Sequence, residues 1–174
     1  MLFSIGVPIE RVERLGMDEF FRAFQVNMFS GVRLCQMALP HLRKSRGGIL
    51  FTSTGVVDIP MSGWSAYCSS KAAMNMFLKC LAREEAANLS AVMCVRPGIV
   101  DTDILTDIYS QRSRDQVMDA DQYQFMQLQK EKGKLLSPEE PADVMAQLII
   151  KAPRELNGAF FAFNDENVKS LLSQ

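Results

Sequence analysis

The sequence predicts an α/β protein in which a parallel sheet of about three strands is flanked by helices. Helical and strand patterns alternate along most of the chain. The expected strands are short apolar runs, typical of buried strands, and the segments between them are long enough for the crossovers that parallel strands need. We expect the 174 residues to form one domain, because the chain suffices for one core and is too short for two.

The first expected elements are two helices and a strand. Asp18 can cap a helix whose apolar residues follow at helical spacing, and a second helix is expected over residues 29–42. Pro40 lies near the end of this second helix and could kink or end it. Two glycines at 47–48 then break the chain before an apolar strand at 49–51, with Thr52 behind it.

The second half of the chain predicts two more helices and two more strands. Residues 66–85 form an expected helix that is apolar on almost all sides, so it should be buried on more than one side. A short strand is expected at 91–95. Residues 101–136 are polar and Gln-rich without a clean period, and we interpret them as a mobile substrate lid. Ser137 begins a further helix with proline at its first helical position, and a last strand is expected at 159–163.

Composition restricts the function classes. The chain has 19 Lys and Arg against 20 Asp and Glu and no basic stripe, so we expect no nucleic-acid partner. The N-terminal apolar run stops at Pro8, which predicts neither a leader nor a membrane segment but a cytoplasmic protein. We assign no metal site and place His41 on the surface. No C-x-x-C motif occurs, and we expect all four cysteines to be reduced and buried: Cys35, Cys68, Cys80 and Cys94.

Tyr67 and Lys71 are the first candidates for chemistry. They lie four residues apart on one expected helix, so their side chains share a face. A nearby ammonium favours the phenolate and lowers the pKa of a tyrosine, which makes the pair a candidate proton donor. The pair alone carries little weight, since this spacing is common in ordinary helices. Thr54, thirteen residues before Tyr67, ends the preceding strand and adds a hydroxyl that can face the helix.

Three ordered segments resemble signatures of the short-chain dehydrogenase/reductase family: G-G-I-L-F-T-S-T-G, W-S-A-Y-C-S-S-K and V-R-P-G-I-V-D-T-D. The resemblance implies that Tyr67 donates or accepts the substrate proton and that Lys71 lowers its pKa and binds the nicotinamide ribose. Thr54 would polarise the carbonyl, where the family has serine. Ser53 could share this role, although neighbours on a strand point to opposite faces. A plain strand-end turn is the alternative interpretation of both hydroxyls.

The resemblance extends to a helix and a loop. Asn27 resembles the family's helix asparagine, which supports a water relay to the lysine from a distorted helix; an amide bonding its own backbone is the alternative. The loop after the second strand resembles the one that wraps the nicotinamide, or is simply a turn. Besides Tyr67 and Lys71, the residues implied in cofactor binding are Pro97, Gly98, Ile99, Val100 and Thr102.

The family's glycine-rich turn has no counterpart here. None of the ten glycines forms G-x-x-x-G-x-G or G-x-G-x-x-G, where a dinucleotide fold binds pyrophosphate. The resemblance therefore implies a partial Rossmann-like, doubly wound fold that keeps the family's strands 5, 6 and 7. The sequence is most similar to fungal sepiapterin- and benzil-reductase-like members, which implies NADPH-dependent reduction of a carbonyl, often in a dicarbonyl compound. NADP(H) is the implied cofactor, NAD stays open, and we expect weak binding and little or no turnover.

Two functional hypotheses follow. One is a carbonyl reductase whose cofactor half is encoded upstream. The other is a non-catalytic interaction module that pairs with a full-length relative. In the family, the counterparts of helices 18–42 and 66–85 form a dimer interface, and the apolar strand at 49–53 would have an unpaired edge. We therefore expect a homo-oligomer or an aggregate.

Overall fold

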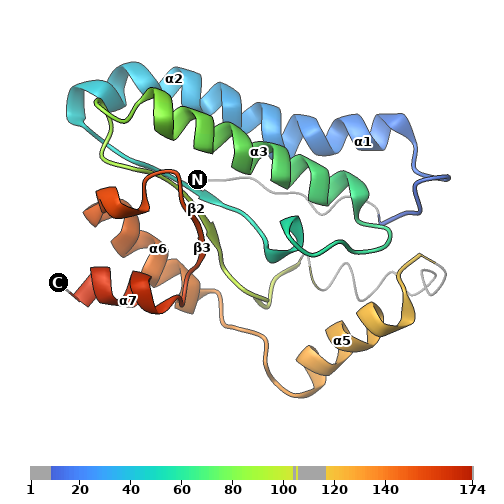
Figure 1. Ribbon diagram of the computed structural model, residues 1–174. Helices are drawn as coiled ribbons and strands as arrows, with labels where there is room; N and C mark the ends of the chain where they lie inside the picture. The colour runs from blue at the N-terminus through green and yellow to red at the C-terminus, as the bar shows by residue number, and fades with distance from the viewer. Residues whose placement is uncertain (1–8, 104, 106–116, 174) are drawn as a thin grey trace.

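The computed structural model describes residues 9–103, 105 and 117–173, and these residues form three layers (Figure 1). The middle layer is a parallel sheet of three strands in the order β1-β2-β3. The strands are β1 (Ile49–Thr52), β2 (Val92–Arg96) and β3 (Phe160–Ala162). This arrangement confirms the predicted α/β class and its parallel sheet. Among the described residues no strand pairs with the outer edge of β1.

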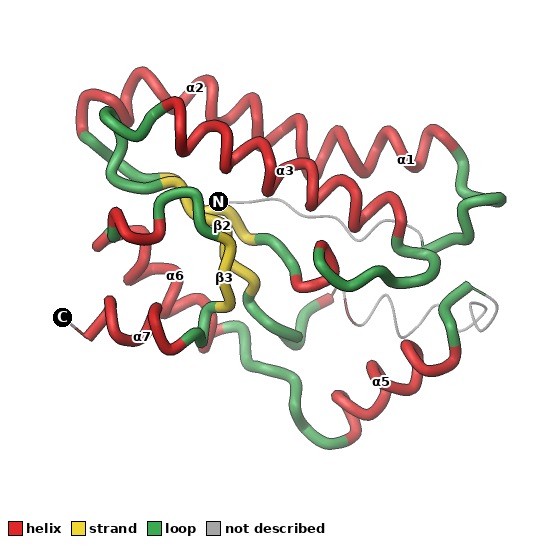
Figure 2. The backbone as a smooth tube through the Cα atoms, viewed as in Figure 1, coloured by secondary structure: helices red, strands yellow, loops and turns green. Residues whose placement is uncertain are grey.

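Helices cover both faces of the sheet, as the tube in Figure 2 shows. On one face lie α1, α2 and α3, and on the other lie α6 and α7. The helix bounds are Met17–Phe24 for α1, Ser30–Ser45 for α2, Ser65–Glu84 for α3, Ala120–Glu131 for α5, Glu139–Lys151 for α6 and Glu166–Ser173 for α7. A π-helical turn, Gln25–Phe29, joins α1 to α2, and short 3₁₀ turns lie at Gly55–Val57 and Arg154–Leu156.

Strand β2 shows why the core has two halves. Side chains alternate across a strand, so Val92 and Cys94 point to one face while Met93 and Val95 point to the other. Val92 and Cys94 pack with Met74 and Leu78 of α3 in the first half of the core. Met93 and Val95 pack with Leu148 of α6 and Val168 of α7 in the second. A strand covered on both faces explains the uninterrupted apolar run in the sequence.

The helix ends differ in detail from the sequence-based expectation. Helix α1 is capped by Gly16 rather than Asp18, which lies in the first turn where its carboxylate suits the positive end of the helix dipole. Helix α2 runs three residues past residue 42 and includes Pro40 without ending there; it stops at Arg46, which adopts a left-handed conformation. Pro138 is the cap of α6, one position before the helix that it was expected to start.

Two helices were not predicted. Helix α5 lies within the lid region 101–136, which has regular structure because Met126 is buried against residues distant in sequence. The lid's residues 104 and 106–116 lie outside the described part of the chain. The second missed helix, α7, follows the last strand and buries Val168. The lid therefore combines a helix with the turns that flank it in the described residues.

The cysteines only partly match the prediction. All four are free thiols, but only Cys35 and Cys94 are buried. Cys68 is half-buried and Cys80 is exposed, because both lie on sides of α3 that do not face the sheet. His41 is exposed, as expected. None of the described helices has the length and apolar character required to span a membrane.

Candidate active site

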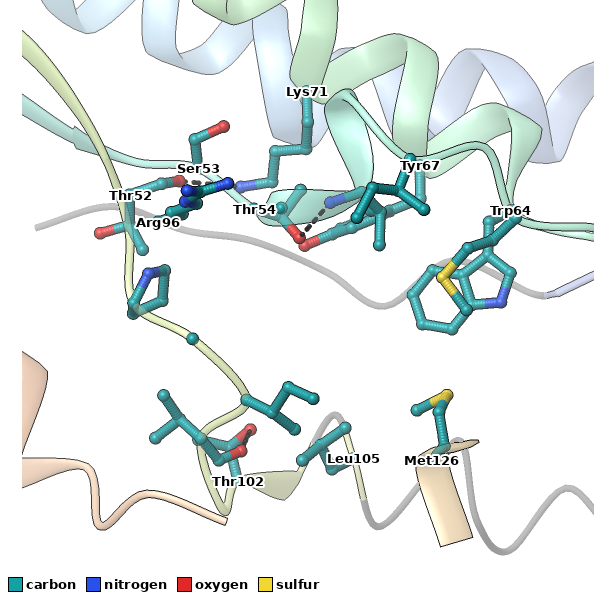
Figure 3. A pocket seen from close by; sticks show the side chains of 18 of the residues that line it. Thr52, Ser53, Thr54, Trp64, Tyr67, Lys71, Arg96, Thr102, Leu105 and Met126 are labelled. Carbon is teal, nitrogen blue, oxygen red and sulfur yellow. Dashed lines mark hydrogen bonds between the residues drawn. The ribbon is translucent and has the colours of Figure 1, made fainter. Parts of the chain in front are cut away.

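A pocket of about 820 Å³ opens where β1 and β2 end (Figure 3). In a parallel α/β sheet the carboxyl ends of the strands are the usual place for a ligand. The pocket brings together two groups of residues that the sequence singled out. One group lies at the end of β1 and on α3, and the other lies in the loop after β2. These lining residues are Ser53, Thr54, Tyr67, Lys71, Pro97, Gly98, Ile99, Val100 and Thr102.

Lys71 is fixed close to Tyr67 by its contacts. Its Nζ lies 5.8 Å from the centroid of the Tyr67 ring and 5.1 Å from that of Phe51. The same atom donates a hydrogen bond of 3.2 Å to the carbonyl oxygen of Thr52, at the end of β1. The ammonium is thus held between the strand and the tyrosine, where it can favour a developing phenolate.

Burial sets the protonation of Lys71. Only 2% of its surface is exposed, and this desolvation lowers its pKa to about 8. Burial also raises the pKa of the Cys94 thiol to about 12, so the thiol is neutral where Lys71 titrates. The lysine is therefore a mostly protonated group at neutral pH whose charge is costly to bury.

The structure distinguishes Thr54 from Ser53. The Thr54 side chain points toward Tyr67, whereas the Ser53 side chain points the other way (Figure 3). The Thr54 Oγ1 accepts a 3.4 Å hydrogen bond from the backbone N–H of Val56, so it also caps the short turn after β1. The Ser53 Oγ is buried and has no hydrogen-bond partner among the described residues. Both the catalytic and the turn interpretation of Thr54 fit this geometry.

Asn27 lies in the π-helical turn between α1 and α2 and is fully buried. Its Nδ2 donates a 3.2 Å hydrogen bond to the Oγ of Ser70, which in turn donates to the carbonyl oxygen of Tyr67 at 2.8 Å. The asparagine is therefore connected to the Tyr67 helix through Ser70. The sequence did not single out Ser70, although its position one residue before Lys71 was a usable signal.

The loop after β2 turns sharply at Gly98. Its φ of 82° is a conformation that side chains disfavour, and a Cβ there would lie 2.7 Å from Leu136 Cδ1. Val100 and Leu136 form an isolated parallel bridge, in which the N–H of Leu136 donates to the carbonyl of Ile99 at 2.9 Å. This bridge ties the loop to the segment that leads into α6. The loop is thus a fixed wall of the pocket.

Sequence reasoning missed the apolar end of the pocket. Ile9, Met61, Trp64 and Met126 line it, and they come from three distant segments. The ring of Trp64 contacts that of Tyr67 edge-to-face, with centroids 5.7 Å apart. Trp64, the sole tryptophan of the sequence, lies one helical turn before Tyr67, and this spacing was the available signal. Within the described residues, no group of three or more potential ligands could hold a metal ion.

The fold is that of a partial doubly wound α/β domain, and the chain belongs to the short-chain dehydrogenase family, whose model matches residues 5–113. Among curated relatives, a Saccharomyces cerevisiae benzil reductase that forms (S)-benzoin is 41% identical over 150 residues, covering 84% of this chain and 57% of the relative. An uncharacterized oxidoreductase of Schizosaccharomyces pombe is 35% identical over 162 residues, covering 92% of this chain and 64% of the relative.

A solved structure supports the same assignment. The crystal structure of a short-chain dehydrogenase/reductase from Saccharomyces cerevisiae superimposes with a TM-score of 0.91 at 33% identity. The superposition covers 97% of this chain and 66% of the chain in that crystal structure. The chain thus spans between 57% and 66% of these relatives' lengths.

Proposed function

We propose that the pocket is the carbonyl-reducing site of an NADP(H)-dependent oxidoreductase, with Tyr67 as the proton donor. The observation that carries this proposal is the meeting of Tyr67, Lys71 and Thr54 with the Pro97–Gly98 loop in one pocket. The substrate class is a vicinal dicarbonyl compound, in keeping with the benzil reductase among the relatives. A cytoplasmic location is part of the proposal.

The residues present fit the nicotinamide end of the cofactor. A Cβ at Gly98 would collide with Leu136, so glycine keeps this loop in place beside the pocket, which Tyr67 and Lys71 also line. When bound, the dinucleotide would supply a hydride to the carbonyl carbon. Tyr67 would give its proton to the carbonyl oxygen of the substrate, and Lys71 would stabilise the resulting phenolate. Thr54 would donate a hydrogen bond to the same carbonyl oxygen of the substrate.

We expect this 174-residue chain alone to oxidise little or no NADPH in the presence of benzil. Without a glycine-rich turn it makes no pyrophosphate contacts of the usual kind, and these contacts also orient the nicotinamide. NADPH absorbance measures the rate. The matched experiment joins the chain to the N-terminal part of the yeast benzil reductase that precedes the shared region, and turnover should then appear.

The two outcomes test different parts of the proposal. Substantial turnover by the chain alone, with its mass verified, would contradict the expected inactivity. A joined protein that folds and binds NADPH but leaves benzil unreduced would contradict the assignment as a dicarbonyl reductase. In that case the second candidate, a non-catalytic interaction module, gains support. It is favoured because no strand in the described part of the chain pairs with the outer edge of β1, and an apolar strand edge readily pairs with another chain.

We also propose that the chain self-associates through α1, α2 and α3. Phe21, Leu34, Met37 and Met76 are large apolar side chains on these helices that are exposed in the single chain. The double substitution Leu34→Glu and Met37→Glu should shift the protein toward monomer, because it places charge in an apolar interface. Sedimentation velocity measures the shift, and Ile150→Glu on the exposed side of α6 is the control. A compact wild-type monomer would contradict self-association.

A further inference from the structure

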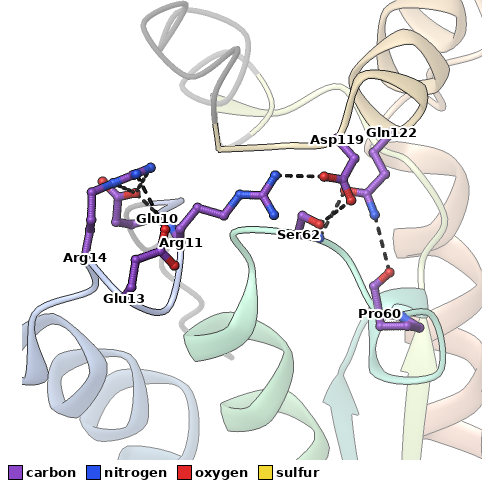
Figure 4. A network of polar contacts seen from close by, with 8 residues as sticks. All are labelled: Glu10, Arg11, Glu13, Arg14, Pro60, Ser62, Asp119 and Gln122. Carbon is purple, nitrogen blue, oxygen red and sulfur yellow. Dashed lines mark hydrogen bonds and ion pairs between the residues drawn. The ribbon is translucent and has the colours of Figure 1, made fainter.

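Three segments distant in sequence meet beside the apolar end of the pocket (Figure 4). They are the N-terminal stretch 9–11, the loop 60–63 before α3, and residues 117–122 at the start of α5. We call this meeting point the clasp. Its polar contacts lie on the outside and its apolar contacts face the pocket.

Asp119 is the centre of the polar contacts. One oxygen of its carboxylate accepts a 2.7 Å hydrogen bond from the Arg11 guanidinium, and the other accepts one from the Ser62 hydroxyl. These two bonds hold the pKa of Asp119 below its usual value, and the bond from Ser62 has the larger effect. The carboxylate is therefore charged throughout the neutral range, and both bonds are charge-assisted.

Gln122 adds a second bridge between the same segments. Its Oε1 accepts from the backbone N–H of Ser62 at 3.0 Å, and its Nε2 donates to the carbonyl of Pro60 at 3.5 Å. On the other side of the loop, the backbone N–H of Glu10 donates to the carbonyl of Gly63 at 3.0 Å. The loop is thus bonded both to α5 and to the N-terminal stretch.

The apolar side of the clasp is tightly packed around Gly63. This glycine has a φ of 81°, and a Cβ there would lie 2.6 Å from Val117 Cγ1 and 2.7 Å from Ile9 Cγ2. Ile9 and Val117 are both buried, in one cluster with Met126 of α5. Trp64, the neighbour of Gly63, packs against this cluster and lines the pocket. The position of α5 therefore determines how far Met126 stands from Trp64.

We propose that Arg11, Ser62, Asp119 and Gln122 are positioning residues that set the width of the apolar end of the pocket, so that it accepts a flat aryl group next to the reacting carbonyl. This inference rests on the proposed function and deepens it. Trp64, Met61, Met126 and Ile9 offer dispersion and sulfur–aromatic contacts to a flat apolar substituent. Gln122 also lines the pocket, whereas Arg11, Ser62 and Asp119 do not line it and act through the position of α5.

The lone tryptophan provides a direct readout. In Asp119→Ala, Trp64 emission should shift to longer wavelength and acrylamide quenching should increase, because α5 no longer covers the indole. Benzil, added without any cofactor, should quench the emission of Trp64 in the wild type. The affinity of the protein for benzil should fall about two- to fivefold in Arg11→Met, a modest loss because partly exposed ion pairs are weak. The affinity should fall further in Asp119→Ala. Lys169→Met is the control, since Lys169 forms an exposed ion pair with Glu166 on α7, away from the clasp.

A charge exchange separates positioning from general loss of structure. The double variant Arg11→Asp with Asp119→Arg should recover part of the wild-type emission and benzil affinity that each single change loses. Unchanged emission, quenching and affinity in both Asp119→Ala and Arg11→Met would overturn the proposal, as would equal effects in Lys169→Met. Failure of NADPH oxidation by the joined protein would reject the proposed function and leave these cofactor-free results interpretable.

Discussion

Replacing Tyr67 by Phe in the protein joined to a cofactor-binding half is expected to lower kcat for benzil reduction about a hundredfold to ten-thousandfold, the usual contribution of a general acid. The substitution removes one hydroxyl and keeps the ring that contacts Trp64. KM should change little, because the lost interaction develops in the transition state. Steady-state rates of NADPH oxidation measure the effect.

Tyr123→Phe is the matched control for this substitution. Tyr123 lies on α5, and its hydroxyl accepts a 2.7 Å hydrogen bond from Gln127 on the same helix. It does not line the pocket. The control should retain full activity. A Tyr67→Phe protein that retains kcat within about threefold, with NADPH binding intact, would remove Tyr67 from the role of proton donor.

Replacing Lys71 by Met is expected to stabilise the 174-residue chain at neutral pH by a few kcal/mol, on the order of the free energy that corresponds to its pKa shift. Burial lowers the pKa of Lys71 from 10.5 to about 8 in the folded protein. Below pH 8 the folded state carries the full cost of the buried ammonium, while above pH 10.5 this cost is absent because the lysine is neutral in both states.

The pH dependence gives this prediction its sign. Between pH 8 and 10.5 the unfolded chain binds more protons at Lys71 than the folded chain, so wild-type stability should rise relative to Lys71→Met. Urea unfolding at several pH values measures this difference. Lys79→Met, an exposed lysine on the same helix, is the control and should track the wild type. A constant difference across the window would show that Lys71 keeps its ordinary pKa.

The sequence predicted those parts of the fold that depend on local pattern. The strand at Ile49–Thr52 and helix α3 were expected within one residue of their observed bounds, because apolar runs without glycine or proline specify them. Helix α5 was missed because its sequence is polar, and Met126 is buried in a cluster that includes Ile9, over a hundred residues earlier. No local pattern contains that cluster.

The candidate site divides in the same way. Tyr67 and Lys71 share a helix, so their proximity follows from the spacing alone. The choice between Thr54 and Ser53 needed the strand end itself, where the two side chains point in opposite directions. The wall that includes Trp64 and Ile9 depends on how three segments meet, which only the tertiary structure reveals.

The π-helical turn has a geometric consequence for the long helical layer. Ala23, Asn27, Gly31 and Cys35 are all buried at intervals of four residues. In a continuous α-helix each such interval overshoots a full revolution by about 40°, so the buried stripe would wind away from α3. The wider π turn takes up more residues in its revolution and offsets this drift. The π turn thus works as a rotational correction, which keeps the buried sides of both α1 and α2 facing α3.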